Sequence, residues 1–211
     1  YQRAISLNPN YPTAHQWFAL YLRSRSRFDD AMSEIQRARA LDPFSPLLGA
    51  NAAFAYLIKN DLNSAIEADK KVLELDPGFW IAHNDLGWAY LKQRRYEEAN
   101  AEFQKAVDSS GRASVTLGNQ GHCYGVTGKK SEALAVAKEL EERYSKQEAI
   151  GFFVATVYAG LGDKDQAFAW LEKDFQHRSG QLPFIVWWPN FDSMRSDPRF
   201  DDLVHRMGLT P

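Results

Sequence analysis

The chain has 211 residues, of which 45% are apolar and 25% are charged, so it holds enough apolar material for one or two folded domains. Its 25 lysines and arginines nearly balance its 27 aspartates and glutamates, and the net charge of -2 excludes broad electrostatic affinity for nucleic acid or an anionic membrane. The apolar stretches near residues 47–58 and 150–161 are shorter than the roughly 20 residues that a membrane-spanning helix needs.

A fixed period runs along the chain in four columns of residues that agree in phase. The columns are Ala31, Ala65, Ala99, Ala133 and Ala167; the small residues Ala19, Ala53, Gly87, Gly121 and Ala155; the large residues Leu22, Tyr56, Tyr90, Tyr124 and Tyr158; and Pro9, Pro43 and Pro77. Neighbouring members of each column are 34 residues apart. A constant step of between about 20 and 50 residues is typical of a repeat architecture.

In chain order, residues 1–11 are predicted to be the second helix and closing proline of a unit whose first helix is missing. Five units of two helices each follow, and residues 182–211 form a capping segment. The units are 12–45, 46–79, 80–113, 114–147 and 148–181. In the third unit the apolar spacing predicts helices over 81–91 and 96–107, joined by a polar turn. We expect the small residues to lie where two helices cross closely.

The pattern Leu86-Gly87-x-x-Tyr90, then Ala99-x-x-x-Phe103-x-x-Ala106, with a closing proline such as Pro77, resembles the tetratricopeptide repeat (TPR) family over residues 12–181. This resemblance implies an all-α, right-handed superhelical solenoid with a C-terminal helical cap. Three positions depart from the family pattern: Asp69 replaces an aromatic residue, Gly111 replaces a closing proline, and Asp174 replaces a small residue.

The aromatic tail after residue 181 has two interpretations. A solenoid must cover its last apolar face, so we expect a cap packed on the fifth unit; a partner-binding patch is the alternative. Asp197 before Pro198 predicts a helix start, and Gly208 predicts its end. Residues 191–200 resemble the ends of bacterial regulators that carry such repeats after a winged-helix, nucleotide-cyclase-like or Ser/Thr kinase domain. The chain begins with Tyr1 and not Met, so we expect it to be a fragment of a longer protein. The resemblance implies that this protein is a cytoplasmic bacterial regulator.

The sequence offers no convincing catalytic or metal-binding motif. Residues 121–131 approach a phosphate-binding loop, but the glycine spacing fails, and we expect Gly128 and Gly162 to form turns between paired helices. The five histidines form no ligand cluster, and Cys123, the single cysteine, is expected to be a small buried residue. No strained nucleophile turn is present. We therefore expect no enzyme activity, no cofactor and no metal.

Charge also follows the period, with cations at the turn inside each unit and anions at the start of each second helix. The cations are Arg23, Arg25, Arg27, Lys59, Lys92, Arg94, Arg95, Lys129, Lys130 and Lys164. One interpretation is that these charges complement the helix dipoles. The other is a basic rim for an acidic partner.

The family resemblance places partner binding on the first helix of each unit. The expected partner-binding residues are Gln16, Leu20, Arg23, Asn51, Phe54, Leu57, Ile81, Asn84, Trp88, Lys92 and His122. Such a strip can accept an extended segment or an amphipathic helix, although the apolar members could instead pack against neighbouring first helices. We do not expect a clamp for C-terminal carboxylates. Of the five residues that such a clamp uses in the family, only Asn51 agrees when the positions are placed on units one to three. Only Asn119 agrees when they are placed on the other two sets of three successive units.

We therefore expect a scaffolding module that binds a peptide or helix of a protein partner, within a bacterial signalling or transcriptional regulator. We expect no direct nucleic-acid binding and no membrane association. Two alternatives stay open: a homo-oligomerisation module, and a sensory domain that binds a small molecule between Trp88 and His122.

Overall fold

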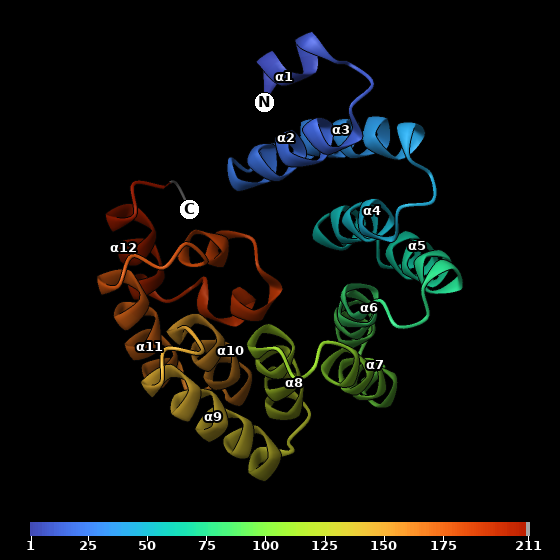
Figure 1. The fold of residues 1–211 in the computed structure, drawn as a ribbon. Coiled ribbons are helices and arrows are strands. Elements are labelled where there is room, and N and C mark those ends of the chain that lie inside the picture. The colour runs from blue at the N-terminus through green and yellow to red at the C-terminus, as the bar shows by residue number, and fades with distance from the viewer. Residues whose placement is uncertain (210–211) are drawn as a thin grey trace. The chain divides into compact units, whose positions relative to one another are not determined.

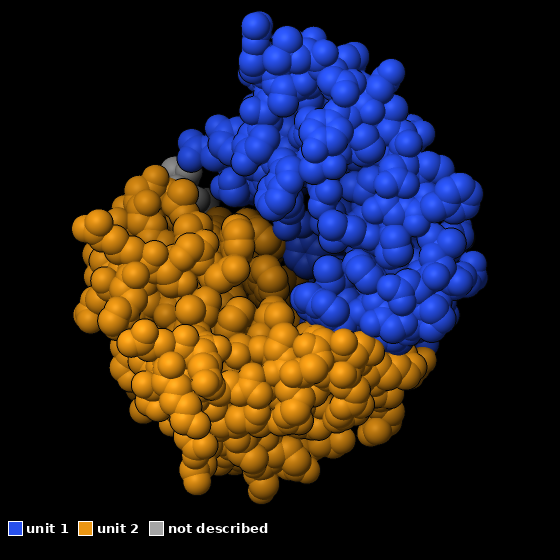
Figure 2. Space-filling view, in the orientation of Figure 1, with its two compact units in different colours: residues 1–95 blue, residues 96–211 orange. Residues whose placement is uncertain are grey.

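The computed structural model describes residues 1–209, and these residues form helices and no strands (Figure 1). The elements are α1 (Gln2–Leu7), α2 (Pro12–Ser24), α3 (Phe28–Leu41), α4 (Pro46–Ile58), α5 (Leu62–Leu75), α6 (Trp80–Lys92), α7 (Tyr96–Ser109), α8 (Ser114–Val126), α9 (Lys130–Ser145), α10 (Gly151–Leu161), α11 (Lys164–Gln176), the 3₁₀ helices η1 (Leu182–Val186) and η2 (Pro189–Met194), and α12 (Pro198–Arg206). The chain divides into two compact units, unit 1 (residues 1–95) and unit 2 (residues 96–211) (Figure 2).

Each unit is built from helices that pack in sequential pairs. In unit 1, α2 packs on α3 and α4 on α5; in unit 2, α8 packs on α9 and α10 on α11. The all-helical solenoid expected from the sequence is therefore confirmed. Four first helices begin where the predicted repeats begin, and α10 begins at Gly151, three residues after the predicted boundary at Glu148. The division into five repeats and a capping segment stays a prediction.

The period of the sequence reappears in the backbone at the turn inside each helix pair. Left-handed φ angles occur at Ser26 (56°), Asn60 (60°), Arg94 (60°), Gly128 (78°) and Gly162 (75°), which follow one another at the same step as the sequence columns. The next residue in each turn donates its N–H to the carbonyl of Leu22, Tyr56, Tyr90, Tyr124 or Tyr158, at 2.8–3.0 Å. This bond is typical of the Schellman ending of a helix. The turn roles expected for Gly128 and Gly162 are confirmed.

We expect Gly128→Ala to lower the free energy of unfolding by about 1 kcal/mol, because alanine at positive φ places its Cβ too close to the following carbonyl oxygen. A Cβ at Gly128 would meet nothing within 4 Å, so the whole cost arises in the backbone. Urea denaturation measures it. Gly180→Ala is the matched control, because Gly180 is equally uncrowded and has no positive φ. Equal losses for both variants would contradict the backbone explanation.

Small residues permit close helix crossings, as expected. A Cβ added at Gly121 on α8 would lie 2.7 Å from a methyl carbon of Val157 on α10 and 2.9 Å from one of Val136 on α9. A Cβ at Gly125 would lie 2.5 Å from the backbone of Gly160. These contacts are closer than side chains tolerate, so the sequence keeps glycine there.

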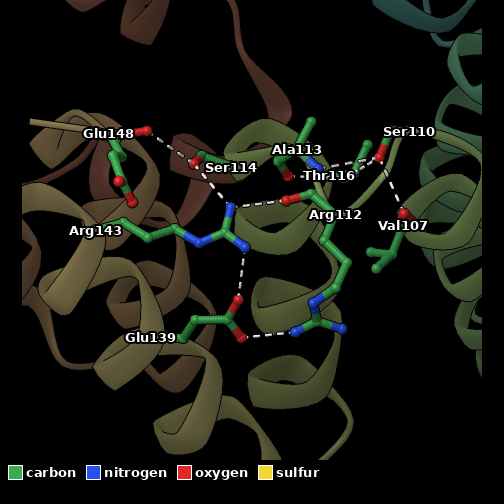
Figure 3. A network of polar contacts seen from close by, with 9 residues as sticks. All are labelled: Val107, Ser110, Arg112, Ala113, Ser114, Thr116, Glu139, Arg143 and Glu148. Atoms are coloured by element: carbon green, nitrogen blue, oxygen red, sulfur yellow. Dashed lines mark hydrogen bonds and ion pairs between the residues drawn. The ribbon is translucent and has the colours of Figure 1, made fainter.

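Two departures from the family pattern have local explanations in unit 2. The buried Asp174 carboxylate accepts the N–H groups of Gly151 (2.6 Å) and Phe152 (2.9 Å), so it caps α10, whose preceding residue Ile150 supplies no side-chain acceptor. Where Gly111 replaces the closing proline, a polar network fixes the entry into α8 (Figure 3).

That network connects the loop before α8 with α9. The Ser110 hydroxyl oxygen accepts the N–H of Ala113 at 3.2 Å, and Arg143 donates to the carbonyl of Arg112 at 2.7 Å. Glu139 then bridges Arg143 (2.7 Å) and the Arg112 guanidinium (2.6 Å) (Figure 3). The loop is thus held by side chains in place of a rigid proline.

Candidate functional site

The structure places ten of the eleven expected partner-binding residues in unit 1, on α2, α4 and α6, and His122 on α8 in unit 2. Six of the ten keep some exposed surface, and we call this set the first-helix face. It comprises Gln16, Leu20, Arg23, Asn51, Ile81 and Lys92. Within α2, Gln16, Leu20 and Arg23 share one side of the helix because residues three and four apart lie one turn from each other.

Three members of the first-helix face line one pocket. Leu20, Arg23 and Asn51 line a small hollow of about 20 Å³, with room for about one water molecule, between α2, α3 and α4, together with Ala19, Ala31, Ile35 and Ala55. The Nδ2 atom of Asn51 is buried and has no hydrogen-bond partner among the described residues. An unsatisfied buried donor destabilises a protein, so an acceptor that reached this amide would stabilise it.

Arg23 supplies the charge of the pocket. Its guanidinium carbon lies 4.8 Å from the centre of the Phe54 ring, which is a cation–π geometry. Burial lowers the pKa of Arg23 to about 10, while the Asp85 carboxylate acts in the opposite direction. Arg23 therefore remains positively charged at neutral pH and can attract an acidic group.

Two buried carboxylates in unit 1, those of Asp69 and Asp85, were not predicted from the sequence. Asp69 on α5 is 0% exposed, and neither of its oxygens has a hydrogen-bond partner among the described residues. Burial, and secondarily the charge of Asp85, raise the pKa of Asp69 well above its usual range. Burial raises the pKa of Asp85 to about 7, although a hydrogen bond from Asn84 and the charge of Arg23 lower it. The sequence signal that could have indicated the buried Asp69 was its departure from the family pattern, in which it replaces an aromatic residue.

Five of the eleven expected partner-binding residues are buried, and their part in binding a partner stays a prediction. Leu57 is 0% exposed and Trp88 is 2% exposed, so neither offers surface to a partner. His122 is also buried. Its Nδ1 pairs with the carbonyl of Thr156 at 3.0 Å, and burial lowers its pKa to about 4. Phe54 and Asn84 are buried as well: Phe54 lies under Arg23, and Asn84 donates to Asp85 at 3.3 Å.

The basic turns are partly neutralised within the chain. Arg27 pairs with Asp30 at 2.7 Å, and Lys59 pairs with Asp29 at the start of α3. These pairs agree with the local electrostatic interpretation of the charge pattern. Arg27 and Lys59 do not line the pocket, whereas Arg23 does.

The histidines and the cysteine have structural positions. His15 and His83, which share a repeat position, each direct Nε2 at the carbonyl of a closing proline, Pro9 at 2.8 Å and Pro77 at 3.0 Å. Cys123 is fully buried, as expected, and burial raises its pKa to about 12. Within residues 1–209, no group of three or more acidic, histidine or cysteine side chains could hold a metal ion. No helix in that range is long and apolar enough to cross a membrane.

Residues 80–110, which span α6 and α7, match the tetratricopeptide repeat family. This stretch carries a tetratricopeptide repeat. The small glutamine-rich tetratricopeptide repeat-containing protein 2 of Mycosarcoma maydis is 33% identical over 85 residues. That match covers 40% of this chain and 24% of the relative, so the chain corresponds to about a quarter of the relative's length.

Solved structures of TPR proteins share the fold. A thermophilic TPR protein of Thermus thermophilus aligns with a TM-score of 0.67 and 19% identity, covering 84% of this chain and 97% of that one. A tetratricopeptide repeat protein of Parabacteroides merdae aligns with a TM-score of 0.68 and 14% identity over 89% of this chain and 73% of that one. YrrB, described as a TPR protein with an unusual peptide-binding site, aligns with a TM-score of 0.51 and 20% identity over 88% and 96% of the two chains. These likenesses, at 14–20% identity, show the fold alone.

Proposed function

We propose that this chain binds a segment of a protein partner on the first-helix face of unit 1, and that it acts as a scaffold without catalytic activity. The observation that carries this proposal is the pocket lined by Leu20, Arg23 and Asn51, in which the Asn51 amide has a buried N–H group without a partner. An aliphatic wall, a cation and an amide donor together suit a peptide, whose backbone carbonyls accept hydrogen bonds.

The test begins with peptides selected on the intact chain from a random-peptide display library. We expect Leu20→Arg to weaken their binding at least about tenfold, because the longer charged side chain occupies the pocket. Leu134→Arg is the matched control, since Leu134 is 41% exposed on α9 in unit 2. The proposal fails if no peptide is selected, or if both variants bind the selected peptides as tightly as the parent.

A second candidate function is self-association, favoured by aromatic residues on α2 and by Tyr1, which precedes α1. Tyr1, Trp17 and Tyr21 are 57%, 52% and 47% exposed, and the centres of the Tyr1 and Tyr21 rings lie 6.4 Å and 6.3 Å from that of the Phe18 ring. An exposed aromatic cluster of this kind is typical of interaction sites. Light scattering over a range of concentrations tests it, and a monomer mass throughout would exclude it. The small-molecule alternative is not proposed, because its expected walls, Trp88 and His122, are buried.

We propose that this chain is the scaffold part of a longer protein, a cytoplasmic bacterial signalling or transcriptional regulator. It is supported by the resemblance of residues 191–200 to the ends of such regulators. The coding sequence upstream of Tyr1 tests it. A winged-helix, cyclase-like or kinase domain there is expected, and an unrelated domain would overturn the setting.

A further inference from the structure

Unit 2 contains a pocket of about 550 Å³, which we call the α9–α11 pocket. It is lined by the end of α9, the loop that leads to α10 and the end of α11, through Tyr144, Ser145, Ile150, Asp174, His177 and Ser179. Its volume falls within the range of about 300–1,000 Å³ that is typical of small-ligand sites. No residue of the first-helix face lines it, and neither do Trp88 and His122, so it is distinct from the proposed docking site.

The α9–α11 pocket lies where the repeat pattern is interrupted. Ser145 and Ser179 occupy the column that begins with the closing prolines, and Asp174 occupies a column whose other members are apolar. Those members are Ala4, Ala38, Val72, Ala106 and Leu140. Because α10 begins only at Gly151, residues 146–150 form a loop that contributes to the pocket wall. Capping of α10 explains the Asp174 carboxylate but not the cavity beside it, and departures from a regular pattern are expected at functional sites.

Asp174 supplies a buried negative charge to the pocket. It is 1% exposed, and no lysine or arginine within residues 1–209 forms an ion pair with it. Lys173, its neighbour in the chain, lies instead over the Trp170 ring, with Nζ 3.4 Å from the ring centre. Burial raises the pKa of Asp174, although hydrogen bonds from two backbone N–H groups and from Ser179 lower it. A buried charge without a counter-ion destabilises a protein, so a cation that reached this carboxylate would be stabilised there.

The carboxylate of Asp174 has room for a further donor. A carboxylate offers about four acceptor positions, and the N–H groups of Gly151 and Phe152 occupy one on each oxygen. An ammonium ion is a compact cation with three rotatable N–H donors. The hydroxyl oxygens of Ser145 and Ser179, which also line the pocket, can accept those N–H groups that do not reach Asp174.

Tyr144 adds an aromatic wall that its neighbours hold in place. Its ring lies edge-on to Trp170 and His177, with ring centres 5.1 Å and 6.2 Å away. An aromatic face attracts a cation within about 6 Å, and Ile150 offers aliphatic surface to a hydrocarbon stem. We propose that the α9–α11 pocket binds a primary ammonium group on an apolar stem, with the ammonium at Asp174 and the stem beside Tyr144 and Ile150. Free amines and the lysine side chains of a partner share this chemistry.

The test titrates the intact chain with benzylamine and with benzyl alcohol and measures binding by isothermal titration calorimetry. We expect benzylamine to bind at least about tenfold more tightly, because the two compounds share a ring and only benzylamine carries a cation. Asp174→Asn should lower the benzylamine affinity at least about tenfold. Asp163→Asn is the matched control and should leave it unchanged. Asp163 also accepts a backbone N–H at a helix start, that of Gln166 at 3.1 Å, but it does not line the pocket.

A second variant is needed because Asp174 also caps α10. Ser145→Trp places an indole in the pocket from the exposed end of α9, so it should abolish benzylamine binding while circular dichroism shows an unchanged helix content. Equal affinities for the two compounds, no binding of benzylamine, or binding that persists in both Asp174→Asn and Ser145→Trp would overturn the inference. N-acetyl-lysine-N-methylamide distinguishes the two sources of the ammonium group. If it competes with benzylamine, the pocket takes a partner's lysine, and if it does not, the pocket takes a free amine.

Discussion

Phe191→Ala is expected to lower the free energy of unfolding of unit 2 by about 3–5 kcal/mol. Phe191 is fully buried and belongs to the same apolar core as Phe152, Leu117 and Leu171. Removing its ring leaves a cavity and also removes the edge-on contact with Phe152. The adjacent Asn190–Asn119 bond would then lose the packing that shields it from water.

Urea denaturation followed by circular dichroism measures this loss. Phe44→Ala is the matched control, because Phe44 is 77% exposed and its truncation should change stability by less than about 0.5 kcal/mol. Equal unfolding midpoints for the two variants would show that the C-terminal segment does not pack on α10 as described.

Asp69→Leu is expected to stabilise unit 1 by about 1–3 kcal/mol at neutral pH. Both carboxylate oxygens of Asp69 are buried without a partner among the described residues, and the charge of Asp85 adds to the cost of ionising it. Leucine removes the polar group and retains an apolar side chain at a position where the family usually has an aromatic residue.

The buried carboxylates of Asp69 and Asp85 should make the stability of unit 1 fall as the pH rises. Their folded-state pKa values are raised, so the folded state holds protons that the unfolded chain has already released. Their contribution to stability is therefore fully present below the unfolded pKa of about 3.8, and it is lost as the pH rises through the Asp85 pKa of about 7. Asp69→Leu should flatten this fall. Asp69→Asn is the control, because it removes the charge and keeps a buried polar group, so it should flatten the fall with a smaller gain.

Chemical denaturation at a series of pH values decides the outcome. Stability of the parent chain that rises between about pH 4 and 7, or destabilisation by Asp69→Leu at neutral pH, would contradict this account of the buried pair.

The repeat architecture could be predicted because its causes are local and periodic. Tight turns need a residue that tolerates positive φ, and crossing helices need small residues, so Gly128, Gly162 and Gly121 mark the turns and close crossings directly in the sequence. The start of α12 at Asp197, whose side chain accepts the N–H of Arg199 at 3.1 Å, was also predictable from local capping chemistry.

The candidate site was less predictable because burial depends on tertiary packing. Trp88 and Leu57 occupy positions that the family pattern assigns to partner binding, yet packing in this chain covers them. The contact between Asn190 and Asn119 joins residues 71 positions apart, and no spacing rule indicates it. Asp69 stood out as a departure from the family pattern, but its electrostatic link to Asp85 required the packing of α5 on α6.

Hydrogen exchange of the intact chain, with and without a display-selected peptide, tests the docking surface most directly. Slower exchange is expected along the first helices of unit 1, in residues 12–24 and 46–58, because the peptide would order the pocket lined by Leu20, Arg23 and Asn51. Protection confined to the second helices α3 and α5, or to unit 2, would contradict the account.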